Sequence, residues 1–207
     1  LIFNQFDGEF LAEIILIKKK IITLFIIEKV RDPEIVNDIW VIFAPVKKNA
    51  TDIIIQKATE LGASYIIPIL TERTISRRVN LNRMEEIAIE ASEQCERITI
   101  PNIAPLQSLA EIISNWDLNR KIYYGDETIR NSSENFDYNN QLLTHSSGAI
   151  LIGPEGGFSS KEIYFLRSKT FIIPINFGPR VLRSDTAVMC GLVFWHTING
   201  DMKHYLK

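Results

Sequence analysis

The chain has 207 residues, of which 46% are hydrophobic, and its formal net charge is −2. This length and composition suit one or two packed domains, and the charge excludes a protein coated in basic surface, so any nucleic-acid contact must come from local patches. No apolar run reaches the roughly 18 residues of a membrane span, and no signal peptide is visible, so we expect no contact with a membrane.

The first part of the chain is rich in β-branched and aromatic residues, which favour strands. It predicts three short strands, at residues 1–6, 9–17 and 21–28. Asp7-Gly8 and the three lysines 18–20 supply the turns between them. The polar stretch Arg31-Asp32-Pro33-Glu34 follows, and we expect it to separate a small domain, 1–34, from a second domain, 35–207.

After this stretch the chain alternates between strand and helix patterns, which predicts an α/β fold with a mainly parallel sheet. Strands are expected at 40–44, 65–70, 121–124, 149–152 and 171–177, and helices at 50–61, 80–96, 108–114 and 185–198. A polar loop rich in Asn and Ser, 126–147, is expected to be the least informative segment. Cys95 and Cys190 fall within two of the helices, without a His or Cys at metal-ligand spacing. We interpret them as small buried hydrophobic residues of a cytoplasmic protein, and expect no metal site.

A glycine-rich loop follows the apolar run 149–152. It reads Gly153-Pro154-Glu155-Gly156-Gly157, and Ser159 with Glu162 then forms a capping box that opens a helix. A strand that turns into a helix through such a loop places backbone N–H and C=O groups at the carboxyl edge of the sheet, where open α/β proteins bind ligands. The loop matches neither a dinucleotide fingerprint nor a P-loop. A tight turn without a ligand explains it about equally well.

A second loop favours the interpretation of this region as a ligand-binding site. The apolar strand 171–177 ends in Gly178-Pro179-Arg180-Val181-Leu182-Arg183, and Ser184 or Asp185 is expected to cap the last helix. Guanidinium groups are rarely buried without a partner, so packing alone does not explain two arginines beside a glycine–proline turn. A salt bridge or a cap would explain either arginine by itself. Together they predict recognition of an anionic partner.

The two loops resemble the RsmE family of the SPOUT superfamily, which are S-adenosylmethionine-dependent methyltransferases that form N3-methyluridine in small-subunit ribosomal RNA. Two further stretches agree with this resemblance: 55–62 with its continuation to Arg73, and 87–95 with Arg97. Together the four stretches cover most of residues 39–198. The resemblance implies an enzyme that methylates N3 of a uridine in 16S ribosomal RNA, within the small ribosomal subunit, with S-adenosyl-L-methionine as its cofactor.

The resemblance also implies a fold, which is a SPOUT-type mostly parallel sheet with a C-terminal trefoil knot, preceded by a small β-barrel (PUA-like) domain. The chain begins without Met, in what resembles the middle of that barrel, so a basic leading segment is expected to precede it. A homodimer with active sites near its interface is implied as well. The last helix, 185–198, is apolar almost all round and predicts burial on both sides, in a core or in a subunit interface. Its small residues Ala187 and Gly191 permit close helix packing.

The resemblance places the cofactor between three loops, near Ile69-Leu70, 153–157 and 177–182. The expected cofactor-binding residues are Ile69, Leu70, Ile152, Gly153, Pro154, Glu155, Gly156, Gly157, Phe177, Gly178, Arg180, Val181 and Leu182. Because uridine N3 carries a proton at neutral pH, Arg180 and Arg183 are the catalytic candidates, as stabilisers of negative charge on the base or its phosphate. No general base is evident, since Asp185 is as well explained as a helix cap and Glu155 as a brace of its loop.

Between residues 71 and 83 there are four arginines and one acid, Glu72, which gives a local charge of +3. We expect RNA contacts from Arg73, Arg77, Arg78 and Arg83, because this stretch follows a strand end at the same sheet edge as the two loops. The lysines 18–20 are better explained as a solvated turn. Two other functions stay open, a non-catalytic RNA-binding module and another nucleotide-binding transferase, although the chain lacks a P-loop lysine.

Overall fold

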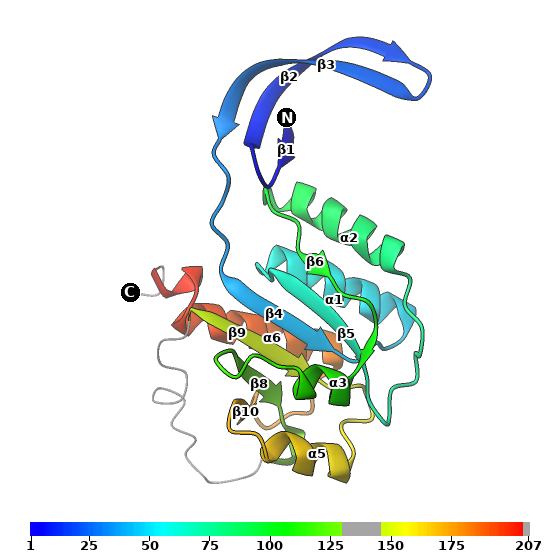
Figure 1. Ribbon diagram of the computed structural model, residues 1–207, viewed down its shortest axis with the longest axis vertical. Coiled ribbons are helices and arrows are strands. Elements are labelled where there is room, and N and C mark those ends of the chain that lie inside the picture. The colour runs from blue at the N-terminus through cyan, green and yellow to red at the C-terminus, as the bar shows by residue number, and fades with distance from the viewer. Residues whose placement is uncertain (130–145, 205–207) are drawn as a thin grey trace.

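The structure, a computed structural model, describes residues 1–129 and 146–204. Residues 1–31 form an antiparallel sheet that projects from the rest of the molecule as a curved arm (Figure 1). Its strands are β1 (Ile2–Asn4), β2 (Gly8–Lys18) and β3 (Ile21–Arg31), in that spatial order. The predicted turn at the lysines is confirmed, because the chain reverses at Lys19, which has a φ of 45°.

Apolar side chains are exposed on both faces of this arm. Ile14 and Ile15 on β2 are 56% and 58% exposed, and Phe25 and Ile26 on β3 are 59% and 47% exposed. Neighbouring residues of a strand point to opposite faces. Neither face of the arm is therefore covered by the residues that the structure describes.

Arg31 ties the base of the arm to the α/β part of the molecule. Its Nε lies 2.6 Å from the Glu9 carboxylate within the arm, and its Nη2 donates to the Glu96 carbonyl oxygen at 2.8 Å. The Glu34 carboxylate lies 3.3 Å from Arg31 and accepts a hydrogen bond from the Ile98 N–H at 3.2 Å. The polar stretch 31–34 thus connects the two parts through specific contacts as well as through the chain itself.

The α/β part is built on a sheet in which every described strand pair is parallel. The strands are β4 (Asp38–Phe43), β5 (Tyr65–Leu70), β6 (Asn102–Ile103), β7 (Gln107–Ser108), β8 (Lys121–Gly125), β9 (Ser147–Ile152) and β10 (Ile172–Ile175). Their order is β10-β8-β9-β4-β5-β6, and β7 pairs with the end of β5. The predicted parallel α/β fold is confirmed.

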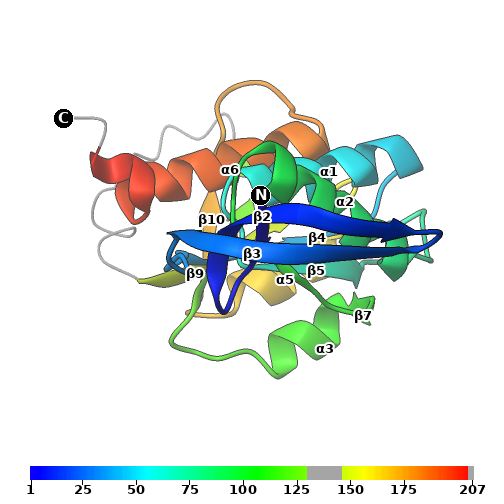
Figure 2. The same cartoon turned by 90° about the horizontal axis from the view of Figure 1, so that it is seen from above.

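Helices cover both faces of this sheet. They are α1 (Lys48–Glu60), α2 (Leu81–Gln94), α3 (Leu109–Ser114), α5 (Ser160–Arg167) and α6 (Ser184–Ile198), with short 3-10 turns at Glu127–Ile129 and Asp201–His204. Figure 2 shows α1, α2 and α6 on one face and α3 and α5 on the other. None of the described helices is long and apolar enough to cross a membrane. Gly62, with a φ of +83°, ends α1 as predicted.

The two faces of the sheet carry separate halves of the core. On β4, Val41 and Phe43 pack on the side of α1 and α6, whereas Ile42 and the residue after the strand, Ala44, pack on the side of α3 and α5. All four side chains are fully buried. A parallel sheet covered on both faces needs apolar residues at consecutive positions, which is why the strands read as unbroken apolar runs.

Helix α6 buries its small residues within the chain. A Cβ added at Gly191 would lie 2.6 Å from Ile150 Cγ2 on β9, so this face of the helix packs directly on the sheet. On its outer side Val193 is 39% exposed, and Met189 and Cys190 are half-buried. Of the two places expected for this helix, a core that covers both sides is therefore excluded, and a subunit interface stays a prediction. Cys95 was also expected to be buried, but it follows the last turn of α2 and is exposed.

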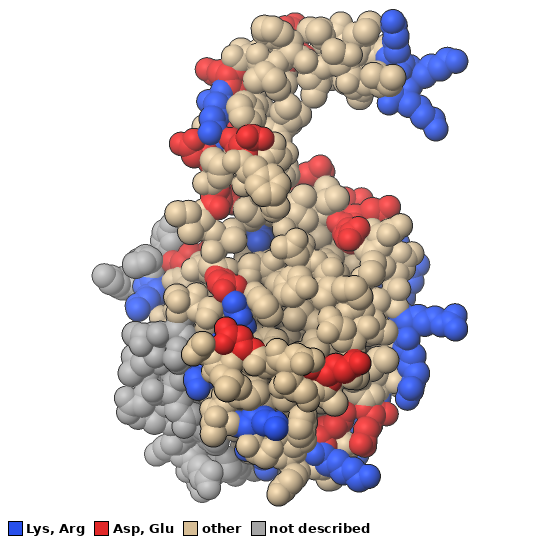
Figure 3. Space-filling model, in the orientation of Figure 1, with Lys and Arg blue, Asp and Glu red and all other residues tan. Residues whose placement is uncertain are grey.

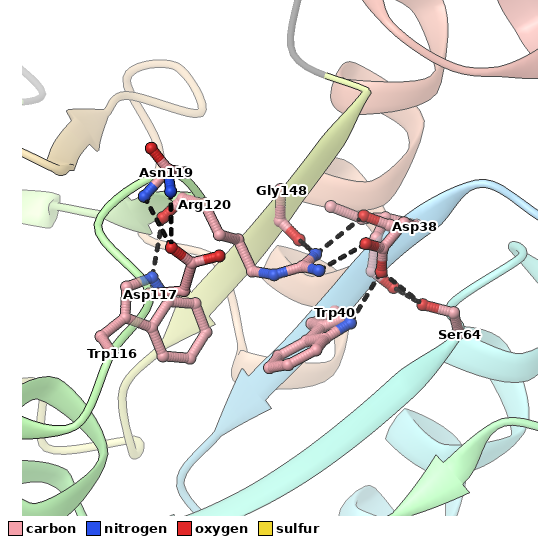
Figure 4. A network of polar contacts seen from close by, with 9 residues as sticks. Asp38, Trp40, Ser64, Trp116, Asp117, Asn119, Arg120 and Gly148 are labelled. Carbon is pink, nitrogen blue, oxygen red and sulfur yellow. Dashed lines mark hydrogen bonds and ion pairs between the residues drawn. The ribbon is translucent and has the colours of Figure 1, made fainter.

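A polar cluster joins the strands at the amino edge of the sheet (Figure 4). Arg120 is nearly buried and forms an ion pair with Asp38 at the start of β4. Its Nη1 also donates to the carbonyl oxygens of Asp38 at 3.0 Å and of Gly148 at 3.2 Å. Trp40 Nε1 donates to the Asp38 carboxylate at 2.8 Å. One arginine thereby holds the first residues of β4, β8 and β9 together.

Candidate functional site

A hollow lies at the opposite, carboxyl edge of the sheet, over the ends of β8, β9 and β10. Its walls are formed by three loops, 125–128, 153–158 and 176–182, each of which follows one of these strands. Ser184 and Ala187, in the first turn of α6, complete the lining. The three loops meet because the strand order β10-β8-β9 places the three carboxyl ends beside one another.

The loop after β9 is built by local interactions that the sequence predicts. The capping box is confirmed, because Ser159 Oγ accepts from the Glu162 N–H at 3.2 Å and the Glu162 carboxylate accepts from the Ser159 N–H at 2.8 Å. Gly157 has a φ of +66° and donates its N–H to the Pro154 carbonyl oxygen at 2.8 Å. Only glycine adopts this left-handed conformation without strain.

The two neighbouring glycines, Gly156 and Gly157, differ in the space that a side chain would find. A Cβ added at Gly156 would lie 3.7 Å from the nearest atoms, on the Arg73 side chain, which is an ordinary contact distance. A Cβ added at Gly157 would lie 2.6 Å from Glu127 Oε1 of the neighbouring loop. The Glu127 side chain is exposed and can turn away, so it is the left-handed backbone that requires glycine at position 157. Position 156 leaves room for a side chain, and Gly156 is not on the wall of the hollow.

The loop after β10 uses a second left-handed glycine. Gly178 has a φ of +100°, and its N–H donates to the Asn176 side-chain oxygen at 2.9 Å. The helix cap expected at Ser184 or Asp185 is wrong, because Arg183 is the N-cap and makes no side-chain capping bond. Ser184 lies within the helix, where its hydroxyl donates instead to the Gly153 carbonyl oxygen at 3.0 Å. This bond ties the start of α6 to the loop after β9.

The loop after β8 was not identified from the sequence. Its centre is Asp126, whose side chain is 2% exposed and accepts hydrogen bonds from the Tyr124 hydroxyl, from Arg167 Nη2 at 2.6 Å and from Thr128 Oγ1 at 2.7 Å. Burial alone would raise the pKa of Asp126, but the bonds from Thr128, Tyr124 and Arg167 outweigh it and hold the pKa below its usual value. The available signal was Gly125-Asp126 directly after the apolar run of β8.

Charged groups gather at the mouth of the hollow. Arg180 lines it and is exposed, as are the carboxylates of Glu127 and Glu155. Arg183 is exposed too, but it does not line the hollow. Within residues 1–129 and 146–204, neither arginine has a hydrogen-bond or ion-pair partner for its guanidinium. Both residues are thus exposed, without a partner in those ranges.

The loop near Ile69-Leu70 does not reach the hollow. Ile69 is completely buried among the core residues on the α3 and α5 side, and Leu70 lines a separate depression with Ser108 and Phe165. The physical reason is the strand order, because β4 separates β5 from β9. Ile69 and Leu70, which were expected to bind the cofactor, therefore lie outside this hollow, and 125–128 forms its third wall instead. Except for Gly156, the other expected cofactor-binding residues line the hollow.

The arginines expected to bind RNA have different surroundings. Arg83 pairs with Asp52 on α1, with 2.7 Å between Nη2 and Oδ2. Arg73 Nη1 donates to the Gly156 carbonyl oxygen at 2.8 Å. Arg77 and Arg78 are exposed, and no partner for their guanidinium groups is found in the described ranges. Figure 3 shows cationic side chains on the side of the molecule where the segment between β5 and α2 runs, and a second group at the tip of the arm.

Known proteins resemble this chain over most of its length. The model of a family described as an RNA methyltransferase domain matches residues 33–195. The chain is 31% identical over 191 residues to the ribosomal RNA small subunit methyltransferase E of Rickettsia conorii, which covers 92% of this chain and 77% of the relative. It is 32% identical over 213 residues to the protein of that name from Buchnera aphidicola (subspecies Acyrthosiphon pisum), with coverage of 98% and 80%.

Two solved structures have the same fold. A methyltransferase of Legionella pneumophila with the cofactor SAM bound superposes with a TM-score of 0.81 at 28% identity, and covers 94% of this chain and 81% of its own. A ribosomal RNA small subunit methyltransferase E of Neisseria gonorrhoeae, bound to S-adenosyl methionine, gives a TM-score of 0.75 at 26% identity, with coverage of 90% and 77%.

Proposed function

The chain belongs to the RNA methyltransferase family whose model matches residues 33–195, and on that premise we propose that it transfers a methyl group from S-adenosyl-L-methionine to N3 of a uridine in 16S ribosomal RNA. The observation that carries the proposal is the hollow at the carboxyl edge, where three strand-end loops and the start of α6 converge. The substrate class comes from the relatives, which are named for small-subunit ribosomal RNA.

The chemistry of the hollow fits this cofactor. Ile152, Phe177 and Leu182 offer apolar walls for an adenine ring. The mouth carries two exposed carboxylates, Glu127 and Glu155, and one exposed guanidinium, Arg180. S-adenosylmethionine has two positive groups, a sulfonium and an ammonium, and one carboxylate. The mouth of the hollow therefore offers one oppositely charged group for each charged group of the cofactor.

The residues of the chain have two tasks in the proposed reaction, which are to position the reactants and to stabilise charge. When bound, S-adenosylmethionine supplies a reactive methyl carbon on a positively charged sulfur. The loops after β8, β9 and β10 orient the reactants, and such positioning accounts for a large part of the acceleration of a displacement reaction. Uridine N3 must also lose its proton. We assign to Arg180 and Arg183, together with the positive end of α6, the stabilisation of the negative charge that develops on the base; the position of Arg180 on the wall of the hollow supports this assignment.

We keep two finer features of the fold as part of the proposal. A trefoil knot in the carboxyl-terminal part is supported by the return of the chain from β10, at the edge of the sheet, to α6, whose first residue Ser184 is bonded to Gly153. A small β-barrel domain over residues 1–34, with the methyltransferase domain at 35–207, is supported by the antiparallel arm and its exposed aliphatic faces.

A homodimer is also proposed. Val193, Met189 and Cys190 leave an apolar strip on the outer side of α6 that a second copy would cover. The start of the same helix lines the hollow, so a dimer through α6 would bring two active sites near the interface. The proposed site of action is the small ribosomal subunit in the cytoplasm.

Mapping of methyl groups on 16S ribosomal RNA by mass spectrometry, from cells with and without the protein, tests this function. We expect one N3-methyluridine to disappear when the protein is absent and to return when the purified protein and S-adenosylmethionine are added. A thermal-shift comparison with S-adenosylmethionine, ATP and NAD separates the two alternatives. Stabilisation by ATP or NAD alone would favour another transferase, and stabilisation by none of the three would favour a binding module.

A further inference from the structure

The segment between β5 and α2 begins with a rigid turn. Thr71 and Thr74 are both buried, their hydroxyl oxygens lie 2.8 Å apart, and the Thr71 N–H donates to Thr74 Oγ1 at 2.9 Å. The Thr74 N–H closes the turn on the Thr71 carbonyl oxygen at 3.2 Å. Glu72 and Arg73 form the exposed corner of this turn. Their direction is therefore set by the buried threonines.

That corner is bonded to the loop after β9. The Glu72 N–H donates to Glu162 Oε1 at 2.8 Å, while the other oxygen of Glu162 accepts from the Ser159 N–H in the capping box. Arg73 Nη1 donates to the Gly156 carbonyl oxygen at 2.8 Å. Two hydrogen bonds thus join the basic segment to the glycine loop, although the partners are 90 and 83 residues apart in the chain. In Figure 1 the two connecting segments run beside each other, one leaving β5 and the other entering α5.

Within residues 1–129 and 146–204, Gly156 is the partner found for the Arg73 guanidinium, and its other N–H groups have none. A guanidinium carries five N–H donors in one plane, and the Arg73 residue is exposed apart from its bond to Gly156. A phosphate bound to those donors would hold the side chain in its present direction. It would also strengthen the bond to Gly156, because both interactions require the same rotamer.

We propose that Arg73 is a positioning residue that couples the binding of an RNA phosphate on its own guanidinium, within the segment that also carries Arg77 and Arg78, to cofactor binding at the glycine loop. This inference rests on the proposed function. When the turn 71–74 is ordered, its hydrogen bonds fix the loop 153–157. The loop then loses less conformational entropy when the cofactor binds. By linkage, the cofactor must raise the affinity for RNA by the same factor as RNA raises the affinity for the cofactor.

Calorimetry with S-adenosylhomocysteine tests this coupling without turnover. Its affinity is measured with and without saturating 16S ribosomal RNA from cells that lack the protein. For the wild type we expect RNA to raise the affinity, within the roughly 5- to 150-fold that such couplings typically reach. In Arg73→Ala the increase in affinity should fall to below about twofold, which lies beneath that typical range. Arg73→Lys should restore part of the increase, because a lysine can donate to the Gly156 carbonyl oxygen.

Arg78→Ala is the matched control, since it removes an equal charge from an exposed arginine of the same segment. It should weaken RNA binding, but saturating RNA should still raise the affinity for S-adenosylhomocysteine as much as in the wild type. A normal increase in Arg73→Ala, or no increase in the wild type, would overturn the inference. An equal loss in Arg78→Ala would overturn it too, because charge rather than the Gly156 bond would then be responsible. Failure of the wild type to bind S-adenosylhomocysteine or to methylate the RNA would instead reject the proposed function.

Discussion

The Arg120 guanidinium lies over the ring of Trp40, 3.9 Å from the ring centroid, and Trp40 in turn donates to the Asp38 carboxylate that pairs with Arg120. Trp116 closes the group from the other side, because its Nε1 donates to the Arg120 carbonyl oxygen at 2.7 Å. The strands β4, β8 and β9 are therefore fastened at their amino ends, opposite the hollow. The functional loops project from strands whose other ends are held.

We predict that Arg120→Ala lowers the free energy of unfolding by about 2 kcal/mol, because a nearly buried arginine with charged and carbonyl partners is removed. The half-exposed Asp38 can regain water, which limits the loss. Urea unfolding monitored by circular dichroism measures the effect. Arg120→Lys should recover little, since a lysine cannot bond to several partners in one plane. A change in the free energy of unfolding below about 0.5 kcal/mol would show that the polar contacts of Arg120 add nothing to stability beyond packing.

We predict that Arg180→Ala slows single-turnover methylation roughly a hundredfold when both RNA and S-adenosylmethionine are saturating, the usual effect of losing a charged stabiliser of a transition state. Arg180 lines the hollow and Arg183 does not, so Arg183→Ala should have the smaller effect on rate. Arg77→Ala provides a charge-matched control that should lower RNA affinity and flatten its salt dependence while leaving the rate intact. If Arg183→Ala is the slower enzyme, the catalytic assignment of the two arginines must be exchanged.

The same substitution at the neighbouring positions 156 and 157 gives a test and its control. Gly157→Ala should cost about 1–2 kcal/mol, because an alanine in the left-handed region is strained and its Cβ would meet Glu127. We expect this cost to appear as weaker binding of S-adenosylmethionine in calorimetry, since the loop must shift. Gly156→Ala adds the same methyl group with ordinary contacts to Arg73 and should fold normally. Equal affinities for the two variants would disprove the role of the backbone at position 157.

The buried carboxylate of Asp126 should make stability depend on pH. Its pKa is lowered in the folded state, so its contribution is present above the unfolded pKa of about 3.9 and is lost as the pH falls through the lower folded value. Asp126→Asn should lower the free energy of unfolding by about 2 kcal/mol at pH 7. Below about pH 4 the difference between variant and wild type should shrink. Urea titrations at pH 7, 4 and 3 would contradict this if the difference stayed constant.

The dimer is predicted to depend on the outer side of α6. Val193→Glu should convert it to a monomer in sedimentation equilibrium, because it places a charge in the apolar strip. Val193 is 39% exposed in the single chain, so the monomer should keep its fold. Tyr164→Glu on α5, where the tyrosine is 79% exposed, is the control and should stay dimeric. A wild-type monomer at micromolar concentration would reject the proposed interface.

The elements that sequence analysis predicted correctly depend on neighbours in the chain. The capping box of Ser159 and Glu162 and the end of α1 at Gly62 are each stabilised by interactions within a few residues. The glycine loops belong to this group too, because Gly157 and Gly178 need a left-handed backbone at their own positions. The resemblance to the family also rests on short motifs of this local kind.

The sequence by itself thus determined the fold class, the family and two walls of the hollow. Only the tertiary structure decided the third wall, because the order β10-β8-β9-β4-β5 brings Asp126 to the site and keeps Ile69 away from it. It also gave Arg73 its partner Gly156, 83 residues away. The physical reason is that side-by-side strands of a parallel sheet are chosen by packing on both faces, and the local pattern of a strand does not contain the identity of its neighbours.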